Sequence, residues 1–416
     1  MDENIKKICE SAKIASLALA LASTDEKNFA LNKIADSLEA NAKEIIKANE
    51  VDIEKGEMNG LSSSILDRLM LNEEKIKGMA DGLRAVAALK DPIGRILEDQ
   101  IRPNGLRIIK ESVPIGVIAV IYEARPNVTS DSAALCLKSG NAVILRGGKE
   151  AINSNIAVAE SMRDALEDTG IPKDCVQLIT DTSHESAGEL MRANGYVDVL
   201  IPRGGKRLIK AVISDSTVPV IETGAGVCHI YVDEEVDVKM AADIIFNAKT
   251  SRPSVCNAAE CMLINREIAK EVLPKIAERL RTKNVEIRGD EETCRILGSL
   301  AKKATDEDYG YEFGDYIIAS KVVGDVYEAI EHIRTYSTGH SETIVTDNAK
   351  TADIFMKCVD SAAVYHNAST RFTDGGEFGM GAEIGISTQK LHARGPLGLN
   401  ELTSVKYKIY GNGQIR

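Results

Sequence analysis

The stretch GVIAVIYEARPNVTSDSAALCLKSGNAVILR, residues 116–146, sets the class of fold. It contains an apolar run at 116–122, a helical stretch at 130–140 and a second apolar run at 141–146. Apolar strands that alternate with helices indicate parallel βαβ units whose sheet is buried on both faces. The alternation continues with apolar runs at 175–180, 197–202 and 218–222. An open, doubly wound α/β sheet is therefore predicted.

A second alternating region follows, and the ends of the chain differ from both. Its predicted strands lie at 228–233, 259–265, 315–323, 342–346 and 362–367, and its helices at about 236–250, 266–283 and 325–336. The first 90 residues have helical periodicity, and a Pro-Asn-Gly turn predicts a hairpin at about 98–114. We predict two doubly wound α/β domains, plus a small hairpin and a C-terminal strand. The expected boundaries are 1–225, 226–367 and 368–416, the last a return segment that ends in a strand at 402–410.

Composition limits the classes of function. The 416 residues are 44% hydrophobic and 27% charged, with a net charge of −12. An acidic chain without a basic block is a poor candidate for binding nucleic acid or an anionic membrane. The run IASLALALA at 14–22 imitates a signal peptide, but Asp2, Glu3 and Glu10 place acid where such a peptide is cationic. We interpret it as part of an amphipathic helix.

Eight cysteines are scattered along the chain, at 9, 136, 175, 228, 256, 261, 294 and 358. They form no C-x-x-C pair, and a chain of this length does not need disulfides to hold a core. Reduced thiols in a cytoplasmic protein are the simplest interpretation. Cys228-His229 with Cys256 and Cys261 fits no common zinc spacing, so no metal site is expected.

Two glycine turns are candidate phosphate sites. Arg203, Gly204 and Gly205 follow the predicted strand at 197–202 and precede a helix, whose free N–H groups can bind an anion. Arg146 and Lys149 follow the strand at 141–146, where open α/β sheets bind ligands and where an arginine often accepts the 2′-phosphate of NADP. From composition alone, solvent-facing turns explain both strings equally well.

Cys256, in KTSRPSVCNAAEC, is a candidate nucleophile. Lys249 and Arg252 lie nearby in the sequence, and positive charge lowers the pKa of a thiol. For an arbitrary cysteine, a buried small side chain is the commoner interpretation.

Several strings together resemble the aldehyde dehydrogenase superfamily. They are SRPSVCNAAE (251–260), YEARPNVT (122–129), IETGAG (221–226) and ARGPLGLNELTS (393–404). The segment 323–344 is similar to the signature of the superfamily members that reduce a glutamyl phosphate in proline synthesis. The signature residues in place are Ala329, His332, Ile333, His340, Ser341 and Glu342. The similarity extends over nearly the whole chain.

The resemblance implies a role for each matching residue. Cys256 matches the nucleophile, and the Asn127 amide matches the oxyanion donor that works with the backbone N–H of Cys256. Gly204 and Gly205, with Arg203 beside them, match the turn under the cofactor pyrophosphate. Arg146 and Lys149 match positions around the adenosine ribose, and Glu312 resembles the glutamate that holds the nicotinamide ribose.

The implied reaction is NADPH-dependent reduction of L-glutamyl 5-phosphate to L-glutamate 5-semialdehyde and phosphate, through a thioester on Cys256. The alternatives are an aldehyde dehydrogenase that uses coenzyme A or water, and a catalytically silent member of the fold. Glu222 matches the general base of hydrolytic members, but an enzyme that exchanges phosphate needs no activated water, so a structural role is expected. A homo-oligomer formed through the hairpin and C-terminal strand is implied, and glutamate 5-kinase is a candidate partner.

Overall fold

The structure, a computed structural model, describes residues 1–416, with the side chains of Ser63 and Ser64 excepted. The chain forms two compact units. Unit 1 comprises Met1–Thr223, Gly379–Gly385 and Leu397–Arg416, and unit 2 comprises Gly224–Phe378 and Ile386–Pro396. The sequence predicts a first boundary at 225/226 and one segment over 368–416, whereas the structure divides this segment between the two units.

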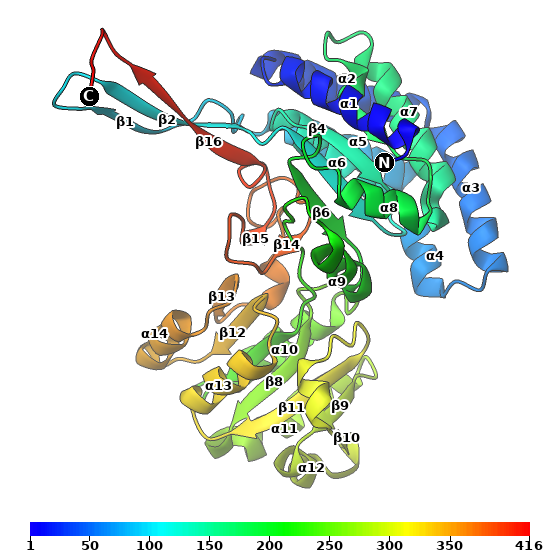
Figure 1. Ribbon diagram of the computed structural model, residues 1–416. Helices are drawn as coiled ribbons and strands as arrows, with labels where there is room; N and C mark the ends of the chain where they lie inside the picture. Colours follow the sequence, from blue (N-terminus) through cyan, green and yellow to red (C-terminus); the bar gives the residue numbers. More distant parts are fainter. The chain divides into compact units, whose positions relative to one another are not determined.

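Unit 1 is built on a parallel sheet of four strands in the order β5-β4-β3-β6. The strands are β3 (Val117–Tyr122), β4 (Ala142–Arg146), β5 (Val176–Leu178) and β6 (Val199–Arg203). The side chains of β3 and β4 are all buried, which explains why these runs are apolar throughout instead of alternating. The predicted doubly wound α/β sheet is confirmed (Figure 1).

The fifth apolar run, at 218–222, forms less strand than expected. An isolated parallel bridge joins Val220 to Leu200, and no longer ladder forms there in the described part of the chain. Leu200 N donates to the carbonyl of Pro219 at 2.9 Å, but Pro219 has no N–H of its own to continue the ladder. The prediction of a full strand at 218–222 is therefore wrong.

Helices cover both faces of this sheet, and five of them precede it, as the periodicity predicts. Their bounds are α1 (Glu3–Leu19), α2 (Thr24–Ala40), α3 (Ala42–Met58), α4 (Ser63–Leu69) and α5 (Glu73–Ala88). Those after β3 are α6 (Asn127–Lys138), α7 (Ile152–Leu166), α8 (His184–Met191) and α9 (Lys206–Asp215), with 3₁₀ turns η1 (Lys149–Ala151) and η2 (Lys173–Cys175). Helix α1 packs Ile5, Cys9 and Ala12 into the core under the sheet. Among the described residues, no helix combines the length and apolarity that a membrane span needs.

Unit 1 also carries an antiparallel sheet of three strands, which we call the arm. Its order is β1-β2-β16, with β1 (Ile96–Ile101), β2 (Arg107–Pro114) and β16 (Thr403–Tyr410). Strand β16 pairs with β2 along its whole length, from Thr403 opposite Pro114 to Tyr410 opposite Arg107. The predicted hairpin and C-terminal strand are both present (Figure 1).

Unit 2 is a parallel sheet of seven strands in the order β10-β9-β11-β8-β7-β12-β13. Its elements are β7 (Cys228–Val232), α10 (Val238–Thr250), β8 (Ala259–Asn265), α11 (Arg266–Arg281), β9 (Glu286–Gly289), α12 (Glu291–Leu297), η3 (Gly298–Leu300), β10 (Ala301–Lys303), η4 (Asp306–Gly310), β11 (Ile317–Val323), α13 (Val326–Tyr336), β12 (Ser341–Val345), α14 (Ala349–Cys358), β13 (Ala363–His366) and η5 (Thr370–Phe372). Strands β9 and β10 were not predicted, because EIRG and AKK are short and polar.

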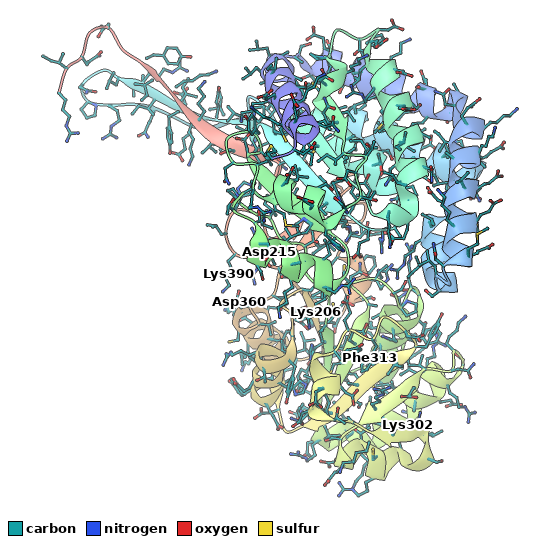
Figure 2. All side chains as sticks on the ribbon, turned by 45° about the vertical axis from the view of Figure 1, so that its right-hand side comes forward. Lys206, Asp215, Lys302, Phe313, Asp360 and Lys390 are labelled. Atoms are coloured by element: carbon teal, nitrogen blue, oxygen red, sulfur yellow. The ribbon has the colours of Figure 1, made fainter. Side chains whose placement is uncertain are left out.

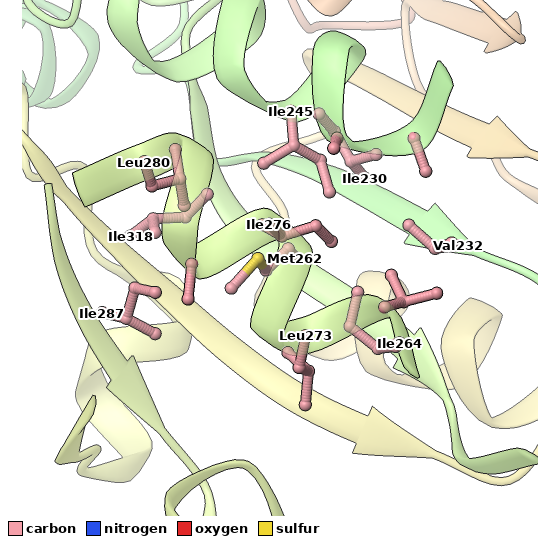
Figure 3. Packing of buried hydrophobic residues seen from close by; sticks show 14 of the residues in the cluster. Ile230, Val232, Ile245, Met262, Ile264, Leu273, Ile276, Leu280, Ile287 and Ile318 are labelled. Carbon is pink, nitrogen blue, oxygen red and sulfur yellow. The ribbon is translucent and has the colours of Figure 1, made fainter. Parts of the chain in front are cut away.

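The unit 2 core lies between the sheet and helices α10 and α11. Ile230 and Met262 from the sheet meet Ile245 from α10 and Leu273 and Ile276 from α11 (Figure 3). All five are fully buried, and each such side chain contributes roughly 1.5–3 kcal/mol by leaving water.

The return segment contributes a short hairpin to unit 2. Strands β14 (Ile386–Ser387) and β15 (Gly395–Pro396) pair antiparallel. Asp360, beyond α14, forms ion pairs with Lys390 and Arg394 of this hairpin, and Lys390 and Asp360 are labelled in Figure 2. These pairs fasten the hairpin to the unit 2 sheet.

Candidate active site

Cys256 lies in the turn that joins α10 to β8, at the amino-terminal edge of the unit 2 sheet. Of the eight cysteines, all free thiols, five are buried, Cys256 and Cys294 are half-buried, and Cys358 is exposed. Burial raises the pKa of Cys9 to about 11 and that of Cys175 to about 12, so those thiols are protonated at neutral pH. Cys256 is only half-buried and is therefore partly accessible to solvent.

The backbone around Cys256 is held by the strand start at 224–228. Cys228 Sγ donates to the carbonyl of Cys256 at 3.2 Å, and Gly226 approaches the same carbonyl so closely that a Cβ there would lie 1.5 Å from the oxygen. Gly226 N in turn donates to Glu312 Oε1 at 3.0 Å. Glu312, for which the family resemblance implies contact with the nicotinamide ribose, therefore holds the segment that supports Cys256.

A second loop, Ser369–Thr373, borders Cys256 on its other side. Arg371 Nε donates to Ser251 Oγ at 3.0 Å, and Arg371 Nη1 donates to Asn257 Oδ1. The guanidinium is half-buried, and burial lowers its pKa, while the charges of Asp374, Arg252 and Cys256 also act on it. Neither Arg371 nor Gly226 was found from the sequence, because both reach Cys256 through long-range contacts.

Lys249, expected to influence the thiol, has a different partner. Its ammonium group forms an ion pair with Glu260 Oε2 at 2.6 Å, and both side chains are almost fully buried. Burial raises the pKa of Glu260 to about 7 and lowers that of Lys249. Glu260 Oε1 also accepts from Gly314 N at 3.2 Å. The pair thus supports the loop that carries Glu312, and the expectation that Lys249 provides free charge for Cys256 is wrong.

The signature residues of 323–344 are buried in the unit 2 core. Glu342 Oε2 accepts from His229 N at 2.6 Å, and His340 Nδ1 lies 2.8 Å from Ser341 Oγ and 3.7 Å from Cys228 Sγ. The segment therefore links strand β12 to the start of β7, and through Cys228 to the carbonyl of Cys256.

One buried cluster has the residue types of a metal site. His229, Cys261 and His332 place one donor atom each within 4.8 Å of one another, with Cys261 Sγ 3.8 Å from His332 Nε2. Structural zinc sites have four ligands, and the described residues here supply three. The ring of His332 also packs against that of Tyr336, with the centroids 4.6 Å apart and the planes tilted by 39°. We assign the cluster to core packing.

In unit 1 the strand order reverses between β3 and β6, which is where open α/β sheets bind ligands. Glu123 N donates to Arg203 O at 3.3 Å, and Gly205 N donates to Glu123 Oε2 at 2.8 Å. A Cβ on Gly204 would lie 2.7 Å from that same oxygen. The turn Arg203–Gly204–Gly205 leads into α9, whose ends are marked by Lys206 and Asp215 in Figure 2. Glu123 was not predicted as part of this turn.

Arg146 is more deeply placed than a solvent-facing turn would require. It is 8% exposed, and its Nη2 donates to the carbonyls of Thr182 at 2.7 Å and Ser183 at 2.6 Å. Its Nε is buried, with no hydrogen-bond partner among the described residues. Lys149 starts η1 and is exposed.

Asn127 begins helix α6, directly after the switch point. Its Nδ2 donates to Asp131 Oδ2 at 2.8 Å. Burial raises the pKa of Asp131 to about 6, although the hydrogen bond from Asn127 acts in the opposite direction. One N–H of the amide is thus directed at Asp131, and the second remains for another acceptor.

Comparison with known proteins decides the family. The Aldehyde dehydrogenase family profile matches residues 1–310. A γ-glutamyl phosphate reductase of Clostridium botulinum (strain Eklund 17B / Type B) is 59% identical over 407 residues, which are 98% of this chain and 98% of that protein. The chain belongs to the γ-glutamyl phosphate reductase family. The enzyme of that name from Caldanaerobacter subterraneus is 58% identical, again over 98% of both chains.

A solved γ-glutamyl phosphate reductase has the same fold. The crystal structure of the Thermotoga maritima protein matches with a TM-score of 0.97 at 49% identity and covers 100% of both chains. The resemblance inferred from the sequence is confirmed, and so is its aldehyde dehydrogenase fold. Proteins of this family work with nicotinamide cofactors.

Proposed function

We propose that this chain reduces L-glutamyl 5-phosphate to L-glutamate 5-semialdehyde and inorganic phosphate in proline biosynthesis, with NADPH as the reductant. The observation that carries the chemistry is the placement of Cys256. Its side chain is half-buried, its carbonyl accepts from Cys228 Sγ and lies close to the backbone of Gly226, and its charge and that of Arg371 interact. A thiol that is accessible, fixed and close to positive charge is suited to nucleophilic attack.

Each step uses groups of this chain. Cys256 Sγ attacks the acyl carbon, so that a C–S bond forms, the bond from that carbon to the phosphate oxygen breaks, and phosphate leaves with the electron pair. Asn127 Nδ2 and the backbone N–H of Cys256 donate to the carbonyl oxygen while its charge is greatest. Bound NADPH supplies the hydride for the resulting thioester. The C–S bond of the thiohemiacetal then breaks, which returns the Cys256 thiolate and releases the aldehyde.

Unit 1 is proposed to bind the cofactor and unit 2 to carry the catalytic cysteine. Gly205 N donates to the Glu123 carboxylate, so the N-terminus of α9 already binds one anionic group. This supports a pyrophosphate site there. The place of Arg146 at the carboxyl end of β4 supports a contact with the 2′-phosphate. We assign Arg203, Gly204 and Gly205 to the pyrophosphate, Arg146 and Lys149 to the adenosine ribose, and Glu312 to the nicotinamide ribose.

The test is a comparison of acyl acceptors in the reverse direction. Purified protein is given glutamate 5-semialdehyde and NADP, with phosphate, coenzyme A or neither, and reduction of NADP is followed by absorbance. We expect reduction that depends on phosphate. Reduction with coenzyme A or with water alone would indicate another aldehyde dehydrogenase chemistry. No reduction, with Cys256 still reactive to alkylation, would indicate a silent member of the fold.

We also propose a homo-oligomer joined through the arm. Its strands expose apolar side chains to solvent, among them Ile101 at 75% and Ile409 at 61%. Strand β1 is also an edge strand of the arm, whose outer backbone groups can pair with another chain. Light scattering that gives the 45.0 kDa of one chain at micromolar concentration would contradict this. Glutamate 5-kinase is the proposed partner, and the cytoplasm the proposed compartment, which the eight free thiols support.

A further inference from the structure

The loop Ser369–Thr373 is fastened to the loop of Cys256 by hydrogen bonds in both directions. Thr370 Oγ1 donates to the carbonyl of Asn257 at 2.7 Å, and Asn257 Nδ2 donates to the carbonyl of Thr373 at 2.9 Å. Asn257 is 4% exposed and directly follows Cys256. The position of one loop therefore determines the position of the other.

The side chain of Arg371 spans the Cys256 turn. Its Nε is bound to Ser251 Oγ at 3.0 Å and its Nη1 to Asn257 Oδ1, so its two anchors lie on either side of Cys256 in the sequence. Both acceptors are neutral, so these two contacts do not cancel the charge of the guanidinium; the carboxylate that acts on it is that of Asp374. Its place next to the nucleophile is thus built into the turn.

A second cation is close to the first. Arg252, exposed on the same turn, acts on Arg371 as a like charge. Like charges placed together are unfavourable unless an anion offsets them. Asp374 is one such anion, but the two arginines outnumber it and leave a net positive charge. An acyl phosphate brings such an anion to Cys256, and a guanidinium fork matches phosphate oxygens.

We propose that Arg371 forms a phosphoryl subsite beside Cys256. It binds the phosphate of the incoming acyl phosphate and stabilises the charge on inorganic phosphate as the C–O bond breaks. The inference rests on the proposed function for its natural ligand, but the subsite is a property of unit 2 alone. Arg371 is half-buried, so the contact is less screened by water than a surface pair.

The subsite can be tested without turnover. Iodoacetate and iodoacetamide alkylate thiols and differ mainly in charge, so an anion subsite favours iodoacetate at Cys256. Cys358, which is exposed, provides an internal reference in the same sample, and peptide mass mapping separates the two sites. We compare the native chain with Arg371→Gln, Arg371→Lys and, as a matched control, Arg281→Gln, an exposed arginine at the end of α11.

The measured quantity is the rate of alkylation by iodoacetate divided by that by iodoacetamide, at Cys256 relative to Cys358. We expect this ratio to fall at least about tenfold in Arg371→Gln, which corresponds to the loss of one charge-assisted hydrogen bond. Arg371→Lys should keep part of the preference, and Arg281→Gln all of it. Inorganic phosphate should protect Cys256 from iodoacetate in the native chain and not in Arg371→Gln. An unchanged ratio in Arg371→Gln would overturn the proposal, and so would equal slowing by both reagents, which would indicate that Arg371 only holds the loops.

Kinetics separate this proposal from the proposed function. In the phosphate-dependent reaction, Arg371→Gln should raise KM for phosphate at least about tenfold and leave KM for the semialdehyde within roughly threefold. Equal increases in both constants would overturn the subsite while leaving the reaction established. An inactive native chain would overturn the proposed function, and the alkylation ratio would still decide the subsite.

Discussion

Replacement of Gly226 by alanine tests whether the position of Cys256 depends on the strand start at 224–228. A Cβ at Gly226 would lie 1.5 Å from the Cys256 carbonyl oxygen and 2.4 Å from its carbon, and real contacts begin at about 3.0 Å. One of the two backbones must therefore move by about 3.0 − 1.5 = 1.5 Å. A misplacement of about 1 Å at a reacting group costs about 10²-fold in rate. We expect Gly226→Ala to lower kcat at least 100-fold, about 2.7 kcal/mol in barrier.

The assay is phosphate-dependent reduction of NADP from glutamate 5-semialdehyde, together with the urea unfolding curve of each variant. Overpacking costs typically about 1–3 kcal/mol of stability, so the variant should remain folded at low urea. Gly78→Ala, in helix α5 with nothing within 4 Å of the new Cβ, is the matched control, and it should keep full activity and gain roughly 0.5–1 kcal/mol of stability. If Gly226→Ala kept more than a third of the native rate, the reasoning would be refuted.

Four further predictions concern single residues. Cys256→Ser should abolish turnover, because the serine hydroxyl does not ionise near neutral pH. NADP binding, measured by titration, should be unchanged. Arg146→Ala should raise KM for NADPH more than for NADH, and urea unfolding should show a loss of about 1–3 kcal/mol, since the carbonyls of Thr182 and Ser183 lose their donor. Glu222→Gln should keep phosphate-dependent turnover within roughly tenfold, a change of about 1.4 kcal/mol in barrier at most, because a reaction that exchanges phosphate needs no activated water. Burial lowers the pKa of His332 to about 3, so the free energy of unfolding should fall as the pH is lowered from about 6.5 toward that value. Urea titrations of the native chain and of His332→Gln should show that the variant loses about 2 kcal/mol less between pH 7 and pH 5.

The sign of the last prediction follows from proton binding. Between pH 3 and about 6.5 the unfolded chain binds a proton at residue 332 that the folded chain does not, so stability rises with pH over this range. His229 acts outside this window. Burial lowers its pKa, but Cys261 and Glu342 outweigh burial and raise it to about 10, so its contribution is lost only above about pH 6.5. A native and a variant curve that run parallel between pH 5 and pH 7 would contradict the assignment of acid sensitivity to His332.

The sequence predicted the sheets well wherever strands are buried on both faces. The run at 117–122 is apolar because both of its faces are covered. The run at 259–265 is also fully buried, and it is apolar apart from Glu260 and Asn265. Strand β9 was missed because it is short and only half of its side chains are buried. The run at 218–222 was overestimated, since its composition is apolar but Pro219 interrupts the ladder.

The candidate site was predictable where a residue type carries its own chemistry. Cys256 and the glycine turn at 204–205 could be named from strings alone. Gly226, Glu123 and Arg371 could not, because their importance lies in which distant backbone they meet. The rule that ligands bind at the carboxyl ends of parallel strands predicts a site in unit 1, but it could not have found Cys256, which lies at the amino-terminal edge of its sheet, before β8.

The pairing of β16 with β2 has a consequence for synthesis of the chain. Residues 107–114 leave the ribosome long before residues 403–410, their partners along the whole ladder. Until the last part of the chain emerges, β2 has only β1 beside it and presents an open strand edge that other chains can pair with. A chain whose synthesis ends just before residue 403 therefore contains all of unit 2 but an unfinished arm in unit 1. The open edge of β2 is thus covered only when residues 403–410 have been made.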